Sequence, residues 1–579
     1  MWAAAVAVAA YSFMPVNEFT SQRRLMFVGY WWRLPMRVRW SDSLEIVLAL
    51  ILSTGLGGAS GCNQEKKTKP PAGSTPPSGK ADRTIPAWAY GARWYQIAVP
   101  RFHNGDRSND PAGTLPWTVE WPPPTSPPGK TSEMDALPYG GDLQGIQKRL
   151  AYFQELGVNA LYLTHVFRGS TQGRYDKVDL RHVDDTLGVK DSLAQITGET
   201  EDPATWRFSA SDRTFLDFLK NAHGQGLRVV VEVVIDKNNA VKHLPQIVRR
   251  WMDPNGDGKT ADGLDGWALR ESGESHPTLS RAWREHVKKI NPSALLIGDI
   301  GDHKQSVSRS EFDVFVAHEV GDAIRRFFAN TTPTYRLKDF LDDLTEIQAY
   351  DGPEEQAPAV LSPLGGPRAG RLLPALSAPA NRAVEDARAL WQLATVVQHF
   401  VSGNPITYYG EEVGMHGGKG PLSRAPMWWR DLPDSTLKAA EYRGEFASLV
   451  RWLHVRRGVQ EPLRRGGIRP VLVDEDRRLF AFARTMPDDD VILVVNYGNA
   501  KHTVTLQAGK PGQMIGILSP QFGRFAPGTR SGRRPEQPGG TYIQPLRTGG
   551  SRQYVDSGGH IRFWINPKSV RIILVSEPP

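Results

Sequence analysis

The chain has 579 residues and a mass of 64.2 kDa, more than one ordinary hydrophobic core can hold, so we expect two folded domains with additional unstructured sequence. Hydrophobic residues make up 40% of the chain, which supports a globular body, and the net charge of +8 is spread along it, so we expect no nucleic-acid partner. The single cysteine, Cys62, excludes an internal disulfide and any metal site built from cysteines.

Residues 36–62 combine the parts of an export signal. The stretch MRVRWSDSLEIVLALILSTGLGGASGC has a basic start, an apolar run too short to span a bilayer comfortably, and small residues before Cys62. It resembles a bacterial lipoprotein signal with ASGC as the lipobox. This resemblance implies translation from Met36, a signal and upstream extension over residues 1–62, and a lipid anchor on Cys62 in the bacterial cell envelope. A buried free thiol is the alternative.

The next segment, residues 63–86, is polar and rich in Pro, Gly and Ser. It contains too little apolar surface to fold, so we expect a disordered tether. This tether would hold the folded body away from a membrane.

From residue 87 to 465, short apolar runs alternate with amphipathic helical ones. This alternation is typical of repeated βα units, and eight such units fit a TIM barrel, a closed (β/α)8 fold. The expected strands are 94–100, 160–166, 228–235, 266–270, 294–300, 312–317, 359–364 and 405–410. The clearest expected helices are 143–157, 214–226 and 386–401.

Residues 466–579 show a different pattern, in which short strands alternate with turns. The stretch RLFAFARTMPDDDVILVVNYGN is characteristic, and it predicts a second, all-β domain of the sandwich type. Within this domain the run RFAPGTRSGRR (524–534) gathers basic residues between Gly and Pro. We interpret it as a solvated loop, and a patch for nucleic acid or an anionic surface is the alternative.

Four sequence blocks in the expected barrel match one known family in the correct order. They are WYQIAVPRFHNGDRSNDP (94–111), GGDLQGIQKRLAYFQELGVNALYLTHVF (140–167), WMDPNGDGKTADGLDGW (251–267) and NPITYYGEEVGM (404–415). These blocks resemble the alpha-amylase family, glycoside hydrolase family 13, and above all its neopullulanase and cyclomaltodextrinase-like branch. The resemblance implies a barrel followed by a β-sandwich, with chemistry at the carboxyl ends of the barrel strands.

The positions that carry chemistry in this family hold other residues here. The resemblance places the family's nucleophile at Arg270, its catalytic acid at Asp299 and its transition-state carboxylate at Gly365. Further replacements occupy neighbouring family positions: Ala268 for Arg, Leu364 for His, and Glu232, Asp236 and Lys237 for Asp, Asn and His.

These replacements remove the reaction's main requirement. Retaining glycoside hydrolysis needs a carboxylate nucleophile and a carboxylic acid about 5 to 5.5 Å apart. Arg270 is protonated at any working pH and cannot attack carbon, and Glu271 points to the opposite face of the strand if Arg270 points inward. We interpret Arg270 as a structural plug that pairs with Asp299 or Glu232, and a grip on an anionic ligand is the alternative.

The family inserts a lobe after the third barrel strand, where it forms one wall of the substrate cleft. Here only the stretch DKNNAVKH (236–243) separates that strand from the next expected helix. The lobe is therefore missing, and we expect a shallower and wetter cleft, which is poor for catalysis but tolerable for binding.

A calcium site is implied by the resemblance of NGDRSNDP and GGD to the corresponding family loops. Its expected oxygen ligands are Asn104, Asp106, Asn109, Asp110, the Gly140 carbonyl and Asp142. Oxygen ligands from two loops suit a hard cation such as Ca²⁺. A polar turn without a metal is the alternative.

Aromatic residues matching the family's sugar platforms are also present. Tyr175, followed by Asp176 in GRYDKVD, matches the platform for the reactive sugar, and we expect both residues to contact substrate. Trp428 and Trp429 lie in a matching block, where we expect core residues. For Tyr175 a buried core position is the alternative.

Three functions remain open from the sequence. The first is a catalytically inactive lipoprotein that binds α-glucans, maltooligosaccharides or a protein partner. The second is an active α-glucan hydrolase or transglycosylase of carbohydrate metabolism that pairs Asp299 with Asp236 or Glu274. The third is a structural scaffold without glycan affinity. We expect the first, because the sequence offers acids only at the wrong strand positions.

Overall fold

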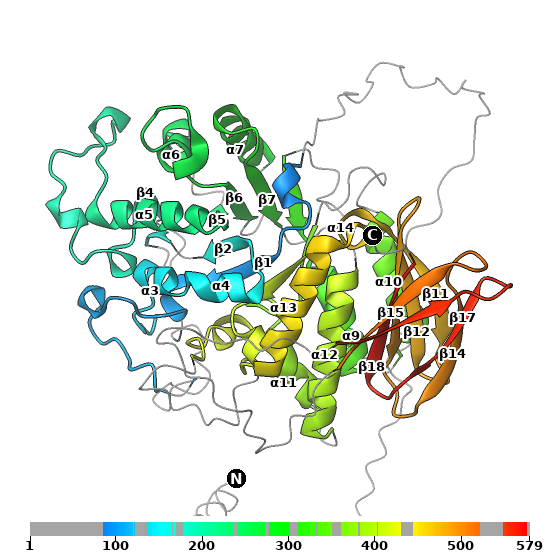
Figure 1. The fold of residues 1–579 in the computed structure, drawn as a ribbon. Coiled ribbons are helices and arrows are strands. Elements are labelled where there is room, and N and C mark those ends of the chain that lie inside the picture. The colour runs from blue at the N-terminus through cyan, green and yellow to red at the C-terminus, as the bar shows by residue number, and fades with distance from the viewer. Residues whose placement is uncertain are drawn as a thin grey trace, which may run out of the picture. The chain divides into compact units, whose positions relative to one another are not determined.

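A computed structural model of the chain describes residues 85–119, 121, 134, 136–164, 166–169, 178–235, 241–271, 277–300, 311–330, 334–349, 360–379, 382–401, 403–429, 444–521 and 548–575 (Figure 1). The expected lipidation site Cys62, the tether up to residue 84 and the basic loop 524–534 lie outside the described residues. The barrel and the sandwich described next belong to one compact unit.

Eight parallel strands close into a barrel, and they follow one another around it in chain order. They are β1 (Trp94–Ala98), β2 (Ala160–Thr164), β5 (Arg228–Ile235), β6 (Gly266–Glu271), β7 (Leu295–Asp299), β8 (Val314–Val316), β9 (Val360–Pro363) and β10 (Asn404–Tyr408). The last strand, β10, pairs with β1 and closes the ring. The predicted (β/α)8 barrel is confirmed, because each expected apolar run overlaps one of these strands.

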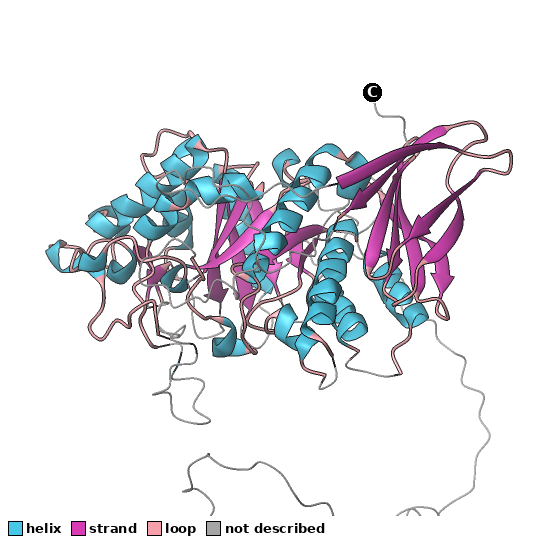
Figure 2. Cartoon of the chain, turned by 60° about the horizontal axis from the view of Figure 1, so that its bottom comes forward, coloured by secondary structure: helices cyan, strands magenta, loops and turns pink. Residues whose placement is uncertain are grey.

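Helices cover the outside of the barrel (Figure 2). They are α3 (Leu143–Lys148), α4 (Leu150–Leu156), α5 (Ala210–Gly224), α6 (Leu244–Met252), α7 (Pro277–Ile290), α9 (His318–Ala329), α10 (Leu337–Ala349), α11 (Leu372–Ser377), α12 (Val384–Phe400), α13 (Gly444–Val459) and α14 (Glu461–Arg465). A short hairpin of β3 (Phe167–Arg168) and β4 (Asp179–Val183) follows β2.

Two helices differ from their expected bounds for local reasons. The expected helix 143–157 is interrupted at Arg149, whose backbone leaves the helical region and whose guanidinium lies over the ring of Trp429, 4.1 Å from its centroid. Helix α5 starts earlier than expected, because Ser209 and Asp212 form a capping box that satisfies its first backbone N–H groups.

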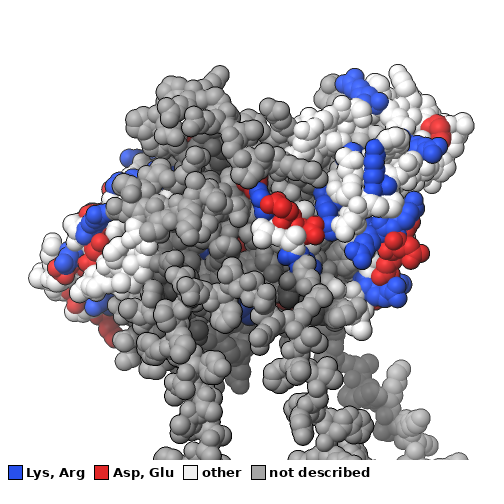
Figure 3. Space-filling model, turned by 90° about the horizontal axis from the view of Figure 1, so that it is seen from below, with Lys and Arg blue, Asp and Glu red and all other residues white. Residues whose placement is uncertain are grey.

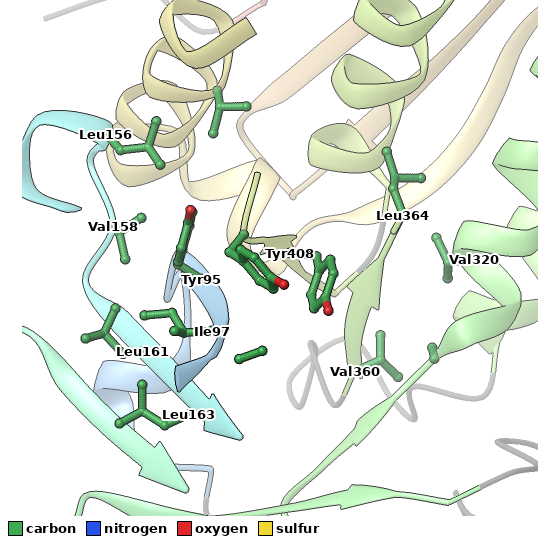
Figure 4. Close-up of a cluster of buried hydrophobic side chains, with 14 of the residues drawn as sticks. Tyr95, Ile97, Leu156, Val158, Leu161, Leu163, Val320, Val360, Leu364 and Tyr408 are labelled. Atoms are coloured by element: carbon green, nitrogen blue, oxygen red, sulfur yellow. The ribbon is translucent and has the colours of Figure 1, made fainter. Parts of the chain in front are cut away.

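Alternating side chains divide the barrel strands into an inner and an outer face. Inward-facing apolar residues fill the barrel, and they include Tyr162, Val230, Ala268, Ile297, Leu361 and Ile406. Outward-facing residues such as Ile97, Leu163 and Val360 pack in the layer between strands and helices (Figure 4). This period-two alternation is what fixes which side chains reach the barrel interior.

The amino end of the barrel is closed by the segment that precedes β1. Ile85, Ala89 and Ala92 pack against the first residues of the barrel strands. The Trp88 indole N–H donates to the Ser293 carbonyl at 2.9 Å, which ties this segment to the loop before β7. The opposite, carboxyl end of the strands is therefore the end at which the interior can open.

An antiparallel sandwich follows the barrel. Its larger sheet has the order β11 (Gly467–Asp474), β12 (Leu479–Thr485), β13 (Asp490–Asn496), β18 (Ser569–Leu574), β15 (Met514–Pro520) and β16 (Thr548–Tyr554). The smaller sheet pairs β14 (His502–Gln507) with β17 (His560–Ile565). The predicted second, all-β domain is confirmed, and its core forms from residues that alternate along these strands.

Aromatic rings join the sandwich to the barrel helices. Phe327 of α9 stacks on Phe340 of α10 with ring centroids 4.4 Å apart, and its other contacts include Tyr497 at 5.0 Å. Phe480 of β12 lies 5.9 Å from Phe340. The outer helices and the sandwich thus share one continuous apolar core.

The surface carries charges of both signs. Lysine and arginine side chains lie beside aspartates and glutamates on the face seen from below (Figure 3). Among the described helices, none is long and apolar enough to cross a membrane.

Candidate functional site

Side chains from several elements converge at the carboxyl end of the barrel strands, which we call the mouth. They are Tyr162 of β2, Glu232 of β5, Arg270 of β6, Asp299 of β7 and His318 at the start of α9. The strand residues belong to the inner face, as Val230 and Ala268 do one step deeper. The sequence-predicted residues Arg270 and Asp299 are therefore brought together.

Arg270 lies between the two acidic side chains of the mouth. Its Nη1 is 3.9 Å from Oε1 of Glu232, and its Nε is 4.0 Å from Oδ2 of Asp299. Arg270 and Asp299 are also register partners on adjacent strands. This geometry matches the pairing expected for a plug, with a side chain that keeps 35% of its surface exposed.

Asp299 has a second partner that the sequence did not indicate. His318 Nε2 lies 2.8 Å from Asp299 Oδ1. Burial acts to raise the pKa of Asp299, but the charge and hydrogen bond of His318, followed by the charges of Arg270 and Arg368, outweigh burial and lower the pKa below its ordinary value. Asp299 is therefore held as a carboxylate.

Glu232 lies deeper in the barrel than Asp299, and its pKa is raised where that of Asp299 is lowered. The Tyr162 hydroxyl donates to Glu232 Oε2 at 3.0 Å inside the barrel. Burial raises the pKa of Glu232, and the nearby charge of Arg270 offsets this only in part. The two carboxyl groups that flank Arg270 therefore differ, with Glu232 the more readily protonated.

The mouth leaves little free space. Arg270, Asp299 and His318 line a cavity of about 30 Å³, whose rim includes Gly365 and Arg368. Such a volume has room for about two ordered water molecules between these side chains. The groups around it are cationic as well as anionic, in contrast to a pair of free carboxylates.

The expected calcium ligands gather in one place near the start of α3. Asn104 Nδ2 donates to Asp110 Oδ1 at 2.8 Å, and a Cβ built on Gly140, whose φ is +71°, would meet both side chains within 2.3 Å. Asp142 caps α3 by accepting from the Gly145 N–H at 2.6 Å, and it also accepts from Asn109 at 3.3 Å. Asp106 lies at the edge, where its carboxylate accepts from Ser108.

This cluster has polar atoms that a cation would satisfy. The buried Oδ1 atoms of Asn104 and Asn109 have no hydrogen-bond partner among the described residues. Burial raises the pKa of Asp142 to about 6, although backbone N–H groups act to lower it, and burial also raises the pKa of Asp110. Among the described residues no group of three His, Cys, Asp or Glu side chains is arranged to hold a metal. A hard cation here would therefore depend on the orphaned amide oxygens of Asn104 and Asn109 together with Asp110 and Asp142. Its contribution there would be positive charge that stabilises the two loops.

The arrangement of strands and the sequence both have known counterparts. The alpha amylase catalytic-domain model matches residues 96–204. Neopullulanase 2 of Thermoactinomyces vulgaris is 29% identical over 464 residues, which covers 74% of this chain and 73% of that protein. A cyclomaltodextrinase of a Bacillus species is 28% identical over 460 residues, covering 73% and 76%. The chain is thus similar to the alpha-amylase family, with a matched catalytic-domain segment at residues 96–204 and a likeness to neopullulanases and cyclomaltodextrinases over about three quarters of its length.

A solved hydrolase structure has a similar fold. The cyclic alpha-maltosyl-(1→6)-maltose hydrolase from Arthrobacter globiformis superposes with a TM-score of 0.55 at 22% identity, covering 73% of this chain and 94% of that one. That hydrolase has also been solved in complex with maltose. At this identity the likeness concerns the fold.

Gly365, where we expect the family's transition-state carboxylate to be replaced, lies against a neighbouring side chain. A Cβ built on Gly365 would lie 2.4 Å from Oε1 of Glu411, a buried carboxyl group 3.7 Å from Arg371. The preceding residue, Leu364, lies in the layer beside Val320 of α9 and is 6% exposed (Figure 4). A longer side chain at Gly365 would therefore have to displace Glu411.

Strand β5 ends at Ile235 and helix α6 begins at Leu244, so the segment between them, where we expect the family's lobe to be missing, is short. A cavity of about 280 Å³ lies in this part of the molecule. Trp206 and His243 line it and are in edge-to-face contact, with ring centroids 5.8 Å apart. Val234, the register partner of Arg270, lines it as well, so the cavity adjoins the mouth.

The charged groups of this second cavity are paired with one another. Arg181 forms a two-pronged contact with Asp179, at 2.9 and 2.8 Å, and Lys242 lies 3.2 Å from Glu201. The lining is thus close to neutral while offering both donors and acceptors beside the Trp206 ring. Such a combination suits an uncharged polyol.

The expected aromatic platforms have mixed outcomes. Tyr175 and Asp176 lie outside the described residues, although Val178, close behind them in the chain, lines the second cavity. Trp429 is 2% exposed and packs edge-on against Phe102, as expected for a core residue. The half-buried Trp428 packs against His416.

Sequence reasoning missed two residues of the mouth. His318 follows β8 in the stretch FVAHEV, and Arg368 follows β9, so both stand at strand ends where the family places chemistry. Their position at strand ends is the sequence signal that could have identified them. Their contact with Asp299 could not be inferred, because it depends on how α9 and the segment after β9 leave the barrel.

Proposed function

We propose that this protein is an α-glucan-binding lipoprotein of the alpha-amylase family that does not hydrolyse glycosidic bonds. The observation that carries the proposal is the position of Arg270, within 4.0 Å of both Glu232 and Asp299. An arginine at the nucleophile position cannot form the glycosyl–enzyme bond. It also forms ion pairs with Glu232 and Asp299, the two carboxyl groups beside it.

The charges of the mouth also oppose the reaction. Glycoside hydrolysis passes through a transition state in which positive charge develops on the sugar ring. Arg270 and Arg368 both act on Asp299, so cations surround the place where the family uses carboxylates. A cationic transition state would be destabilised here, whereas a neutral ground-state sugar would not be.

Glucan affinity is supported by the relatives and by the second cavity. Neopullulanase and cyclomaltodextrinase relatives are named for α-glucan substrates. The cavity bounded by Trp206 and His243 adjoins the mouth and offers an aromatic face beside paired charges. We place one glucosyl unit against Trp206 in this cavity.

The remaining parts of the proposal concern anchoring and metal. A lipid on Cys62 would retain the protein in the bacterial cell envelope, where maltooligosaccharides or a protein partner could be captured. A calcium ion held by Asn104, Asp110 and Asp142 would be structural, because these residues lie on the loops before α3 and not at the mouth.

A second candidate function is favoured by the different pKa values of the Glu232 and Asp299 carboxyl groups. Glu232 has a raised pKa and Asp299 a lowered one, and such a split separates an acid from a nucleophile in working glycosidases. The alternative is therefore an active α-glucan hydrolase or transglycosylase in which Asp299 attacks and Glu232 donates a proton. It requires Arg270 to move aside when substrate binds.

One experiment separates the two functions. The purified protein and its Arg270→Ala, Asp299→Asn and Trp206→Ala variants are incubated for long periods with maltooligosaccharides, starch and cyclodextrin. Reducing-sugar release and calorimetric binding are measured on the same samples. We expect binding without release, and at least tenfold weaker binding for Trp206→Ala. Release by the wild type that Asp299→Asn abolishes would instead establish the enzyme.

A further inference from the structure

A large cavity lies where barrel helices meet the sandwich, and it shares no lining residue with the mouth. It has a volume of about 970 Å³, and its lining comes from α9, α10 and the start of α12 on one side and from turns of the sandwich on the other. Phe327 and Tyr497 form an aromatic part of its wall, with ring centroids 5.0 Å apart. This volume is at the upper end of the range of about 300–1,000 Å³ typical of small-molecule sites.

Unusual backbone conformations gather at this cavity. Among the described non-glycine residues, positive φ angles occur at Asp191, His243, Asn330, Arg478 and Lys568. Three of them line the cavity: Asn330 after α9 at +53°, Arg478 in the turn after β11 at +56°, and Lys568 in the turn after β17 at +47°. Glycine adopts this region freely, whereas residues with a Cβ are strained there.

Two of these strained positions hold long cationic side chains, and this points to a ligand site. Asparagine is a common residue at such a position, so Asn330 needs no explanation. Arg478 and Lys568 are long cations at turn positions where glycine would be easiest to accommodate. Strained residues of this kind persist at ligand sites, where the side chain is needed.

The charges of the cavity do not cancel. Arg336 is neutralised by Glu475, whose two carboxylate oxygens lie 3.0 and 3.2 Å from its Nε. The other charged lining residues are Arg382, Arg478 and Lys568 against a single carboxylate, Asp386. The unbalanced charge is therefore about +2 when every group is ionised.

Two of these cations are held by neutral partners. Lys568 Nζ donates to the Tyr497 carbonyl at 2.9 Å, and Arg382 Nη1 donates to the Leu376 carbonyl at 2.6 Å. Burial lowers the pKa of Lys568, Asp386 partly offsets this, and the charges of Arg478 and Arg382 lower the pKa further. The cations are thus close enough to repel one another, and a bound anion would relieve that repulsion.

We propose that this cavity binds a phosphate monoester of a sugar-sized molecule. A phosphate monoester carries about −1.5 to −2 charges at pH 7, which balances the excess of the three cations over Asp386. Arginine side chains bind phosphate oxygens through two parallel hydrogen bonds, and the Phe327 and Tyr497 rings offer an apolar wall for the face of a sugar. None of these residues belongs to the mouth, so the site is independent of glucan binding.

The test uses calorimetry on the full-length protein with glucose 1-phosphate, inorganic phosphate and glucose. We expect glucose 1-phosphate to bind in the micromolar to low millimolar range, inorganic phosphate to bind at least threefold more weakly, and glucose not to bind. Inorganic phosphate that binds as tightly as glucose 1-phosphate would overturn the sugar-sized ligand. Maltose added to saturation should leave the glucose 1-phosphate affinity unchanged.

Two variants of one turn make the test specific. Arg478→Gly should lower the glucose 1-phosphate affinity at least tenfold while leaving the melting temperature equal or higher, because glycine relieves the strained φ. Arg477→Ala is the matched control, since Arg477 lies in the same turn outside the lining and pairs with Asp474. Equal weakening by both variants would indicate unspecific attraction and overturn the proposal, as would undetectable binding to the wild type.

Discussion

Arg270 and Asp299 end two adjacent barrel strands as register partners, with Nε of the first 4.0 Å from Oδ2 of the second. A cation thus faces a carboxylate at the place where the alpha-amylase family aligns two acids. Both partners keep some contact with solvent, with side-chain exposures of 35% for Arg270 and 15% for Asp299. The stability of this end of the barrel therefore depends on Arg270.

Replacing Arg270 with Ala should destabilise the fold. Removing one partner of a fully buried pair costs about 3–5 kcal/mol, and the partial exposure of Arg270 reduces this to about 1–2 kcal/mol. Chemical denaturation of the two proteins at pH 7 measures the difference. Arg270→Lys keeps the positive charge but lacks the planar guanidinium group, so its free energy of unfolding should lie between those of the wild type and Arg270→Ala. Unchanged stability in Arg270→Ala would contradict the plug.

The effect of Arg270→Ala should also depend on pH. The folded-state pKa of Asp299 lies below its ordinary value of 3.8, so its stabilising effect is present above that pH and is lost as the pH falls through the folded pKa. Without Arg270 this pKa rises. The stability gap between wild type and variant should be largest near pH 7 and narrow below about pH 4. A gap that widens in acid would show that Asp299 is not the partner.

Restoring the family's carboxylate at Gly365 should fail. Gly365→Asp places a Cβ 2.4 Å from Oε1 of buried Glu411 and adds a like charge, which should cost about 3 kcal/mol or more. No reducing sugar should be released by this variant or by Arg270→Asp, because catalytic residues act as a unit. Gly224→Ala, at a position with open space, is the control and should melt like the wild type. A Gly365→Asp variant of wild-type stability would show that Glu411 yields easily.

Chelation should lower the melting temperature of the wild type, because a metal that binds only the folded state stabilises it by up to about 4 kcal/mol at a thousandfold excess over Kd. Asn104→Ala removes an orphaned buried oxygen and should abolish the calcium-dependent shift. Asn255→Ala removes an amide from an exposed turn and should leave the shift intact. A wild type without bound metal and without a shift would rule out the site.

The expected calcium site also predicts that the stability of the metal-free protein and its calcium affinity depend on pH. Without calcium, the pKa of Asp142 is raised to about 6, so the folded state holds its proton more tightly than the unfolded chain. The stability of the metal-free protein should therefore fall as the pH rises from 3.8 to about 6. Calcium should bind more weakly below pH 6, because it competes with that proton. Calorimetric titrations at pH 5 and pH 7 measure this, and equal affinities would exclude Asp142 as a ligand.

Cys62→Ser should remove the lipid. Cells grown with labelled palmitate should label the wild type, and the variant should be unlabelled and either released from membranes or left with an uncleaved signal. A variant of a residue in the tether, Ser74→Ala, serves as the control and should be labelled normally. Label that persists in Cys62→Ser would reject the anchor.

The fold was largely predictable because each barrel strand is a short, nearly continuous apolar run. Val229, Val231 and Val233 face the helices while Val230 faces the barrel interior, so both faces of one strand need apolar residues. This two-sided burial makes the strands conspicuous in the sequence. Helix ends were less predictable, because α5 begins where Ser209 forms a cap and not where the apolar pattern begins.

The candidate site was predictable only at positions that the family fixes. Arg270 and Asp299 could be located from neighbouring motifs, and their proximity follows from adjacent strands. The contact of His318 with Asp299 depends on the angle at which α9 leaves β8, which no local pattern encodes. The cavity beside Arg478 and Lys568 arises from the docking of two domains, so its lining residues are dispersed along the chain.

The closed amino end of the barrel determines from which side a ligand can enter the barrel interior. Ile85, Ala89 and Ala92 seal that end, so the segment before Ile85 joins the barrel on the side opposite the mouth. A small molecule that reaches the groups around Arg270 therefore has to come from the mouth, and a variant that widens the sealed end should not change its rate of entry.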